Sequence, residues 1–193
     1  MTDSQLPPPA ILHLPASSCH IRPFHASSSE YTTLSLAANN PLIAKNMRNA
    51  FPHPYTPADS SKWIAFAHSQ PRTTDFAIAI SSTNTLIGAI GLKAKTDIYH
   101  RSMELGYWVE EESWGKGIAS EAVKVFCDWA FKEWKELIRI DAEVFEGNVG
   151  SRKVLEKAGF VCEGRKRWAV EKGGVVLDVW GYALLRDGGV GEP

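Results

Sequence analysis

The chain has 193 residues, a formal net charge of −1, 44% hydrophobic residues and 22% charged residues. This composition is typical of a soluble globular protein, and a charge so close to zero gives no reason to expect nucleic acid or an anionic membrane as a partner. The three cysteines form no C-x-x-C pair and the histidines show no ligand spacing, so neither a disulfide framework nor a metal site is predicted. Without an apolar run of about 18 residues or a secretory signal, the expected location is cytoplasmic.

The two ends of the chain differ in composition from its centre. Residues 1–17 contain four prolines among serines, which predicts a poorly ordered tail. Residues 188–193 are glycine-rich and are expected to fray. No linker or internal repeat interrupts the sequence between them, so residues 18–187 are predicted to form a single domain.

The first half of this domain mixes short helices with strands. A strand is expected at 19–23 and helices at 28–38 and 42–48, whereas two prolines exclude regular structure from 51–55. Thr56 is then an N-cap residue, with Pro57 at the first helical position and Asp59 three residues after the cap. The helix that follows is expected to bury Trp63, Ile64 and Ala67.

The next elements define the fold class. Three strands separated by short connections, at 76–80, 85–93 and 103–110, predict an antiparallel meander. An amphipathic helix (117–133), a half-buried strand (138–144), a helix (148–158) ended by Gly159, and a hairpin around Gly173 and Gly174 follow in order. This order predicts an α/β (α+β) domain with a mixed central sheet and helices on both faces.

The segment that indicates chemistry runs from Glu104 to Ala119. It reads as a strand, a loop with the sequence Ser-Trp-Gly-Lys-Gly, and the start of an amphipathic helix. Free backbone N–H groups at such a helix start bind phosphate, and Gly115 and Gly117 allow close approach. A P-loop does not fit, and Ser120 together with the upstream meander disfavours a dinucleotide-binding redox domain, which stays as an alternative class.

A second helix start lies downstream, where Asn148 is a predicted N-cap and Ser151 follows three residues later. With this segment, which ends in Gly159-Phe160, the chain resembles the GNAT acetyltransferase superfamily over nearly everything from Cys19 to Arg186. It is most similar to the branch of the ribosomal-protein N-terminal alanine acetyltransferases. The Gly-Tyr-Trp strand, the Trp-Gly-Lys-Gly loop, the Asn-x-x-Ser helix, Arg-Pro-Phe near the start and Phe-Pro-His-Pro-Tyr carry the likeness.

The resemblance implies a sheet that splits in a V between the strands at 103–110 and 138–144, and acetyl-CoA as the co-substrate. It implies that strand backbone pairs with the pantetheine amides, that the loop and helix start bind the pyrophosphate, and that the second helix start borders the thiol. The residues implied in cofactor binding are Trp108, Val109, Glu110, Gly115, Lys116, Gly117, Ile118, Ala119, Asn148 and Ser151.

Two positions depart from the pattern of the superfamily. Glu112 replaces the Arg or Gln that often stands three residues before the first loop glycine. Leu155 replaces a tyrosine that protonates the leaving thiolate in many members. The group that protonates the thiolate is therefore either absent or a different residue. Ser151 is the candidate, and the alternative is that Ser151 is a serine at a helix start without a chemical role.

The expected reaction is direct transfer of an acetyl group to a primary amine in a ternary complex, which needs mainly proximity and orientation. Glu104 is the candidate general base, and a surface or salt-bridged carboxylate is the alternative. Tyr55 and His53 are candidates for binding the acceptor, which is a protein N-terminus or a small amine. A non-catalytic acyl-CoA sensor or interaction module is the other function class, and the chain is expected to be a monomer or a homodimer.

Overall fold

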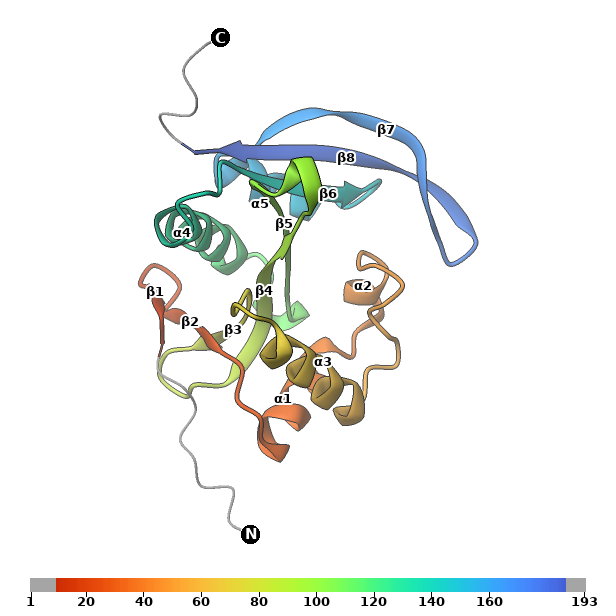
Figure 1. The fold of residues 1–193 in the computed structure, drawn as a ribbon. Helices are drawn as coiled ribbons and strands as arrows, with labels where there is room; N and C mark the ends of the chain where they lie inside the picture. The colour runs from red at the N-terminus through yellow and green to blue at the C-terminus, as the bar shows by residue number, and fades with distance from the viewer. Residues whose placement is uncertain (1–9, 187–193) are drawn as a thin grey trace. The chain divides into compact units, whose positions relative to one another are not determined.

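The computed structural model describes residues 10–186 (Figure 1). Its elements in chain order are β1 (Leu12–Leu14), β2 (Cys19–Pro23), α1 (Ser28–Ala38), α2 (Pro41–Ala44), α3 (Pro57–Ser69), β3 (Asp75–Ile80), β4 (Leu86–Ala94), the 3-10 turn η1 (Asp97–Tyr99), β5 (Ser102–Val109), the 3-10 turn η2 (Glu111–Ser113), α4 (Ile118–Glu133), β6 (Arg139–Phe145), α5 (Val149–Lys157), β7 (Val161–Lys172) and β8 (Val175–Leu185). Within the described residues, no helix combines the length and apolar character that crossing a membrane requires.

The strands form a mixed sheet in the order β1-β2-β3-β4-β5-β6-β8-β7. The pairs β1–β2, β2–β3 and β3–β4 are antiparallel, and β8 pairs antiparallel with both β6 and β7. β5 and β6 pair in parallel, with Ser102–Glu104 opposite Arg139–Asp141. The mixed sheet predicted from the order of elements is thus confirmed.

The chain divides into two compact units. The first unit runs to Gly91 and includes Tyr107–Ala122, whereas the second contains Leu92–Gly106 and the residues from Val123 onward. The expectation that residues 18–187 form one domain stays a prediction. The predicted frayed end, 188–193, lies outside the described residues, as do residues 1–9 of the predicted tail.

The core of the first unit forms where α1 and α3 pack on β3 and β4. Its buried side chains are Phe24, Leu34, Ile64, Ala67, Ala77 and Leu86. α3 begins with the predicted capping box, in which Thr56 and Asp59 each accept a hydrogen bond from the backbone N–H of the other. Ile64 and Ala67 are buried as expected, but Trp63 is exposed and packs on Phe66 instead, so its assignment to the core is wrong.

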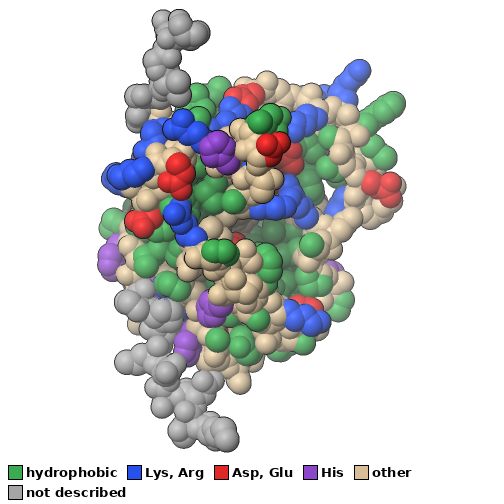
Figure 2. Space-filling model, in the orientation of Figure 1, with side chains coloured by type: hydrophobic (Ala, Val, Ile, Leu, Met, Phe, Trp, Pro, Cys, Tyr) green, Lys and Arg blue, Asp and Glu red, His purple; other side chains and the backbone are tan. Residues whose placement is uncertain are grey.

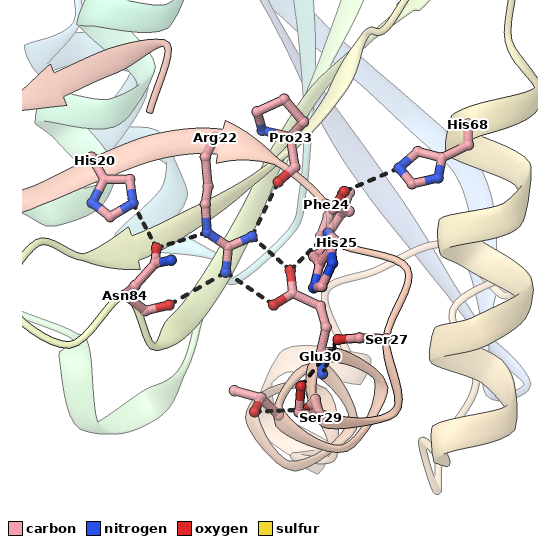
Figure 3. A network of polar contacts seen from close by, with 11 residues as sticks. His20, Arg22, Pro23, Phe24, His25, Ser27, Ser29, Glu30, His68 and Asn84 are labelled. Atoms are coloured by element: carbon pink, nitrogen blue, oxygen red, sulfur yellow. Dashed lines mark hydrogen bonds and ion pairs between the residues drawn. The ribbon is translucent and has the colours of Figure 1, made fainter. Parts of the chain in front are cut away.

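A buried ion pair fastens α1 to β2 in the first unit (Figure 3). Arg22 donates to both carboxylate oxygens of Glu30, at 2.7 and 2.9 Å. Arg22 Nε and His20 Nε2 both lie within hydrogen-bonding distance of Asn84 Oδ1, at 2.8 and 2.9 Å. Glu30 also accepts from the backbone N–H of His25. Arg22 and Glu30 are 1% and 8% exposed, so this network belongs to the interior.

The segment before β2 differs from the expected tail. Leu12–Leu14 form β1, which pairs with Cys19–Ile21. The backbone N–H groups of Ala16 and Ser17 both donate to the Glu121 carboxylate at 2.9 Å. Residues 12–17 are therefore held by backbone hydrogen bonds, and the prediction that they belong to a poorly ordered tail is wrong for them.

The second unit contains β6, α5 and the long hairpin of β7 and β8. β8 pairs with β6 through Val179–Leu185, so its start and the adjoining part of β7 reach beyond β6 (Figure 1). Gly173 and Gly174 both have positive φ, as the predicted two-residue hairpin turn requires. α5 is fixed to β8 by Tyr182, whose hydroxyl accepts from Arg152 Nε and donates to Glu156 Oε1, both at 3.0 Å.

One helix is shorter than expected. The helix predicted at 42–48 corresponds to α2, which ends at Ala44. Two tryptophans of the second unit, Trp129 and Trp180, are half-buried. Trp180 lies at the surface of the sheet with the Arg152 guanidinium 4.4 Å above its ring, which explains its partial exposure.

Candidate functional site

The last residues of β5 belong to the first unit, where the side chain of Trp108 contacts the core. Trp108 is half-buried and packs against the core of the first unit and, edge to face, on Phe51 at 6.1 Å. Gly88 on β4 is required here, because a Cβ at that position would lie 2.4 Å from the Trp108 carbonyl oxygen. The position of the Trp108 backbone thus depends on a glycine in the neighbouring strand.

The backbone after Trp108 already has partners within the protein. The Val109 carbonyl accepts from the Trp114 indole at 2.7 Å, and the Glu110 N–H donates to the Ile87 carbonyl at 2.8 Å. The Glu110 side chain accepts from Ser113 Oγ at 3.0 Å, while partial burial raises the pKa of its carboxyl. Val109 and Glu110 therefore shape the turn into the loop, and their predicted pairing with a pantetheine arm stays a prediction.

The loop before α4 has the geometry of an anion site. Gly115 and Gly117 have φ values of +75° and +81°, which other residues rarely adopt, and a Cβ at either position would meet no atom within 4 Å. The Gly117 carbonyl accepts a hydrogen bond from the Glu121 N–H, so the helix begins here. The N–H groups of Ile118, Ala119 and Ser120 come before this first hydrogen bond of the helix. Lys116 is exposed between the two glycines. These donors and the positive end of the helix dipole fit a pyrophosphate group.

In the second unit, α5 begins as predicted. Asn148 is the N-cap, and its Oδ1 accepts from the Ser151 backbone N–H at 3.1 Å. Asn148 and Ser151 are both half-buried. Leu155, one turn further along the helix, is fully buried, so this position offers no polar group to a ligand.

Glu104, the candidate base, lines a hollow of about 270 Å³ in the second unit. It is half-buried and lies opposite Asp141 in the parallel pairing of β5 with β6. The other lining residues are Lys95, which directly follows β4, and residues of β6, β7 and β8: Arg139, Asp141, Ala142, Glu143, Glu163, Gly164, Arg165, Lys166, Gly181 and Tyr182. Glu104 thus lies in a cavity whose lining is largely ionic; its role as the general base stays a prediction.

The cations of the hollow are each bound to carboxylates. Arg139 donates to both oxygens of Glu163 and, at 2.6 Å, to Asp141, which also binds Lys95. Lys166 donates to Glu143 at 2.8 Å. This bond and the nearby carboxylates, including Glu104, raise the pKa of Lys166. Both signs of charge are also interspersed over the face of the molecule drawn in Figure 2.

Arg165, the remaining cation of the hollow, is connected through Asp178 to Trp168, a residue of β7 with an unusual backbone conformation. Its Nε donates to the buried Asp178, which also accepts from the Trp168 backbone N–H at 2.7 Å. These two interactions hold the pKa of Asp178 below its usual range. Trp168 has a positive φ of 53° and an exposed side chain, and lies at the bulge between Lys166 and Val170.

The two candidate acceptor residues occupy different environments. Tyr55 is buried beside Phe51, with ring centroids 4.9 Å apart, and burial raises the pKa of its hydroxyl to about 12. Phe51 contacts both Tyr55 and Trp108, so the structure gathers these three aromatic side chains. His53, by contrast, is exposed and is not one of these three aromatic side chains.

Sequence reasoning did not identify the Lys166–Glu143 pair or the Tyr182 hydrogen bonds. The Arg165-Lys166-Arg167 run was a visible signal, but it reads first as a solvated strand edge. Which carboxylate each cation meets depends on the register of β6, β7 and β8, and this is not readable from one sequence.

The comparisons with known proteins agree with this architecture. Residues 20–161 match the family model described as an acetyltransferase (GNAT) domain. A probable N-acetyltransferase of Bacillus subtilis, YjcK, is 41% identical over 57% of this chain and 60% of its own length. The chain spans about 60% of the length of the first curated relatives that it matches.

Two solved structures have the same fold. The ribosomal-protein-S5-alanine acetyltransferase of Vibrio fischeri is 26% identical, with a TM-score of 0.73 over 88% of this chain and 94% of that one. RimJ of Mycobacterium smegmatis, in complex with CoA-disulfide, is 23% identical, with a TM-score of 0.76 over 90% and 85%. The fold class expected from the resemblance is confirmed. Since the family model covers most of the described residues, the chain belongs to the GNAT acetyltransferase family.

Proposed function

We propose that the protein is an acetyl-CoA-dependent N-acetyltransferase that acetylates a primary amine, either a protein N-terminus or a small molecule. The observation that carries this proposal is the glycine loop at the start of α4, in a chain that matches the family model. Acetyl-CoA supplies the activated acetyl group as a thioester. The backbone N–H groups of Ile118 and Ala119, next to Lys116, would hold its pyrophosphate.

The chemical step requires three changes at the reacting atoms. The amine nitrogen bonds to the thioester carbonyl carbon, the carbon–sulfur bond breaks, and one proton moves from the amine to the protein while the thiolate leaves or is protonated. We assign Glu104 as the acceptor of the amine proton, directly or through water. We assign Asn148 and Ser151 to the pantetheine and thiol end, with Ser151 as the candidate proton donor.

Titration calorimetry with CoA and acetyl-CoA tests the cofactor assignment. Gly117→Trp should abolish binding, because the indole fills the open space in front of the helix start. Gly173→Trp is the matched control, since Gly173 also has a positive φ and open space around its Cβ but lies in the β7–β8 turn. Binding that survives in Gly117→Trp, or an intact protein that does not bind CoA, would remove the proposal.

The acid–base assignments need separate kinetics. Glu104→Gln should lower kcat/KM most at pH values where the amine is mainly protonated, because the base is then required. Wild-type rates for Glu104→Gln at every pH would contradict its role. Ser151→Ala should change the KM for acetyl-CoA or kcat, and unchanged kinetics would remove Ser151 from the mechanism.

A second candidate function is a non-catalytic acyl-CoA-binding sensor or interaction module. It is favoured by Leu155, which is fully buried where many members of the family have a tyrosine. Release of CoA from acetyl-CoA in the presence of an amine distinguishes the two functions. Binding without turnover across a panel of N-terminal peptides and small amines supports the sensor.

A further inference from the structure

One side chain connects the glycine loop before α4 to the end of β5. Trp114 Nε1 donates a hydrogen bond of 2.7 Å to the Val109 carbonyl, so the residue directly before Gly115 is fixed to the strand. Val109 is 5% exposed, whereas Trp114 is 46% exposed. Because so much of this side chain faces water, its burial contributes less than that of a core tryptophan. The indole N–H is therefore the group that holds Trp114 in its position.

The residues before the glycine loop are held by backbone hydrogen bonds as well. The Glu110 N–H donates to the Ile87 carbonyl of β4 at 2.8 Å, which ties the start of this turn to the sheet. The Trp114 N–H donates to the Glu111 carbonyl at 3.0 Å. The chain is thus ordered by hydrogen bonds as far as Trp114, and the indole ties the end of the turn back to β5.

Beyond Trp114 the backbone has unusual conformational freedom. Gly115 and Gly117 have φ values of +75° and +81°, and glycine loses more freedom than other residues when it becomes ordered. The next fixed point is the first hydrogen bond of α4, from the Glu121 N–H to the Gly117 carbonyl. Residues 115–117 lie between these two fixed points, so the indole bond sets the direction in which the loop leaves the strand.

Order in this loop before a ligand arrives affects how tightly the ligand binds. Backbone N–H groups at a helix start bind an anion when they point at it, and ordering a flexible loop during binding costs free energy. A loop that is already fixed avoids part of this cost. The Val109 carbonyl has two lone pairs, so it can accept the indole N–H and also an N–H of a ligand. The indole bond therefore leaves the strand able to pair with a ligand amide.

We propose that Trp114 is a positioning residue for the cofactor, whose indole N–H holds the glycine loop in the conformation that binds the pyrophosphate. The inference rests on the proposed function, because this loop is the proposed pyrophosphate site. Trp114 takes no part in the transfer of the acetyl group. Its effect therefore belongs to cofactor affinity and not to the chemical step.

Titration calorimetry with CoA and with 3′-phospho-ADP, the nucleotide half of CoA that carries the pyrophosphate, tests the inference. Trp114→Phe keeps an aromatic ring and removes the indole N–H. We expect both ligands to bind about fivefold more weakly, the factor that a hydrogen bond of about 1 kcal/mol provides. Trp63→Phe on α3 is the matched control, because Trp63 is also partly exposed but packs on Phe66 outside the loop. It should leave both affinities unchanged.

Two further measurements separate positioning from a general loss of structure. The midpoint of urea unfolding of Trp114→Phe should stay close to that of wild type, because the lost hydrogen bond belongs to a partly exposed side chain. At saturating acetyl-CoA the variant should reach the wild-type kcat, with only the KM for acetyl-CoA raised. A lower midpoint together with a lower kcat would show that Trp114 supports the fold, and would overturn the inference.

Unchanged affinities in Trp114→Phe, or weaker binding of CoA without weaker binding of 3′-phospho-ADP, would also overturn it. In either case the pyrophosphate site would not depend on the indole. The two proposals fail separately. A wild-type protein that binds neither ligand rejects the proposed function. A wild-type protein that binds both ligands, with the same affinities in Trp114→Phe, rejects only the positioning role.

Discussion

Two networks of charged side chains, one in each unit, differ in their access to water. In the first unit Arg22 and Glu30 are 1% and 8% exposed and share a bidentate contact with further hydrogen bonds from His25 and to Asn84. In the second unit the side chains of Arg139 and Lys166 are 29% and 62% exposed. A buried charge that loses its partner cannot be solvated, whereas an exposed one can.

The difference indicates separate uses for the two networks. The Arg22 network joins β2, α1 and the turn that contains Asn84. Replacing Arg22 by an apolar residue would leave the buried Glu30 carboxylate without this partner and without access to water, so the role of this network is structural. The network around the hollow is partly exposed, so water can solvate a charge there that loses its partner.

The largest effect is expected from Arg22→Met. It leaves the Glu30 carboxylate buried without its partner, and the free energy of unfolding should fall by about 3–5 kcal/mol. Urea unfolding measures it. Lys124→Met, which breaks the exposed pair with Asp128, is the matched control and should change stability by less than about 0.5 kcal/mol. A similar small change for Arg22→Met would show that the interior network is solvated.

A smaller loss is expected from Arg139→Met in the hollow. Arg139 binds Glu163 and Asp141 at partial exposure, so its removal should lower the free energy of unfolding by about 1 kcal/mol. Added salt should reduce the difference between wild type and variant, because it screens exposed charges. A loss as large as that of Arg22→Met, and insensitive to salt, would remove the distinction between the two networks.

The first network should also give stability a pH dependence through His20. Burial, with smaller contributions from Arg22 and His13, lowers the pKa of His20 in the folded protein. As the pH falls below about 6.5, the unfolded chain binds a proton that folded His20 resists, so the free energy of unfolding decreases. His20→Gln should flatten the stability curve between about pH 6.5 and 5. The control is His100→Gln on an exposed histidine, which should leave the curve unchanged.

The smallest effect on stability is expected from Lys166→Met. Its exposed pair with Glu143 should contribute less than about 0.5 kcal/mol to the free energy of unfolding. Chemical denaturation of wild type and variant at the same ionic strength measures the difference. A loss of several kcal/mol would show that Lys166 is a structural group, which would contradict the distinction between the two networks.

The order of the elements and the local features at their ends could be predicted from the amino-acid sequence. The capping box of Thr56 and Asp59, the N-cap Asn148 and the turn at Gly173 and Gly174 depend on residues close together in the chain. The glycine loop before α4 is local in the same sense. These features follow from backbone geometry and nearby hydrogen bonds, which one sequence is enough to reveal.

The contacts between side chains distant in the sequence depend on the tertiary structure. In the folded chain Trp63 is exposed, Ala16 and Ser17 donate to Glu121, and Arg22 is the centre of a buried network. Lys166 also donates to Glu143, across strands that are far apart in the sequence. The physical reason is that strand register and helix packing fix such pairs, and both depend on the burial of the whole chain rather than on any local pattern.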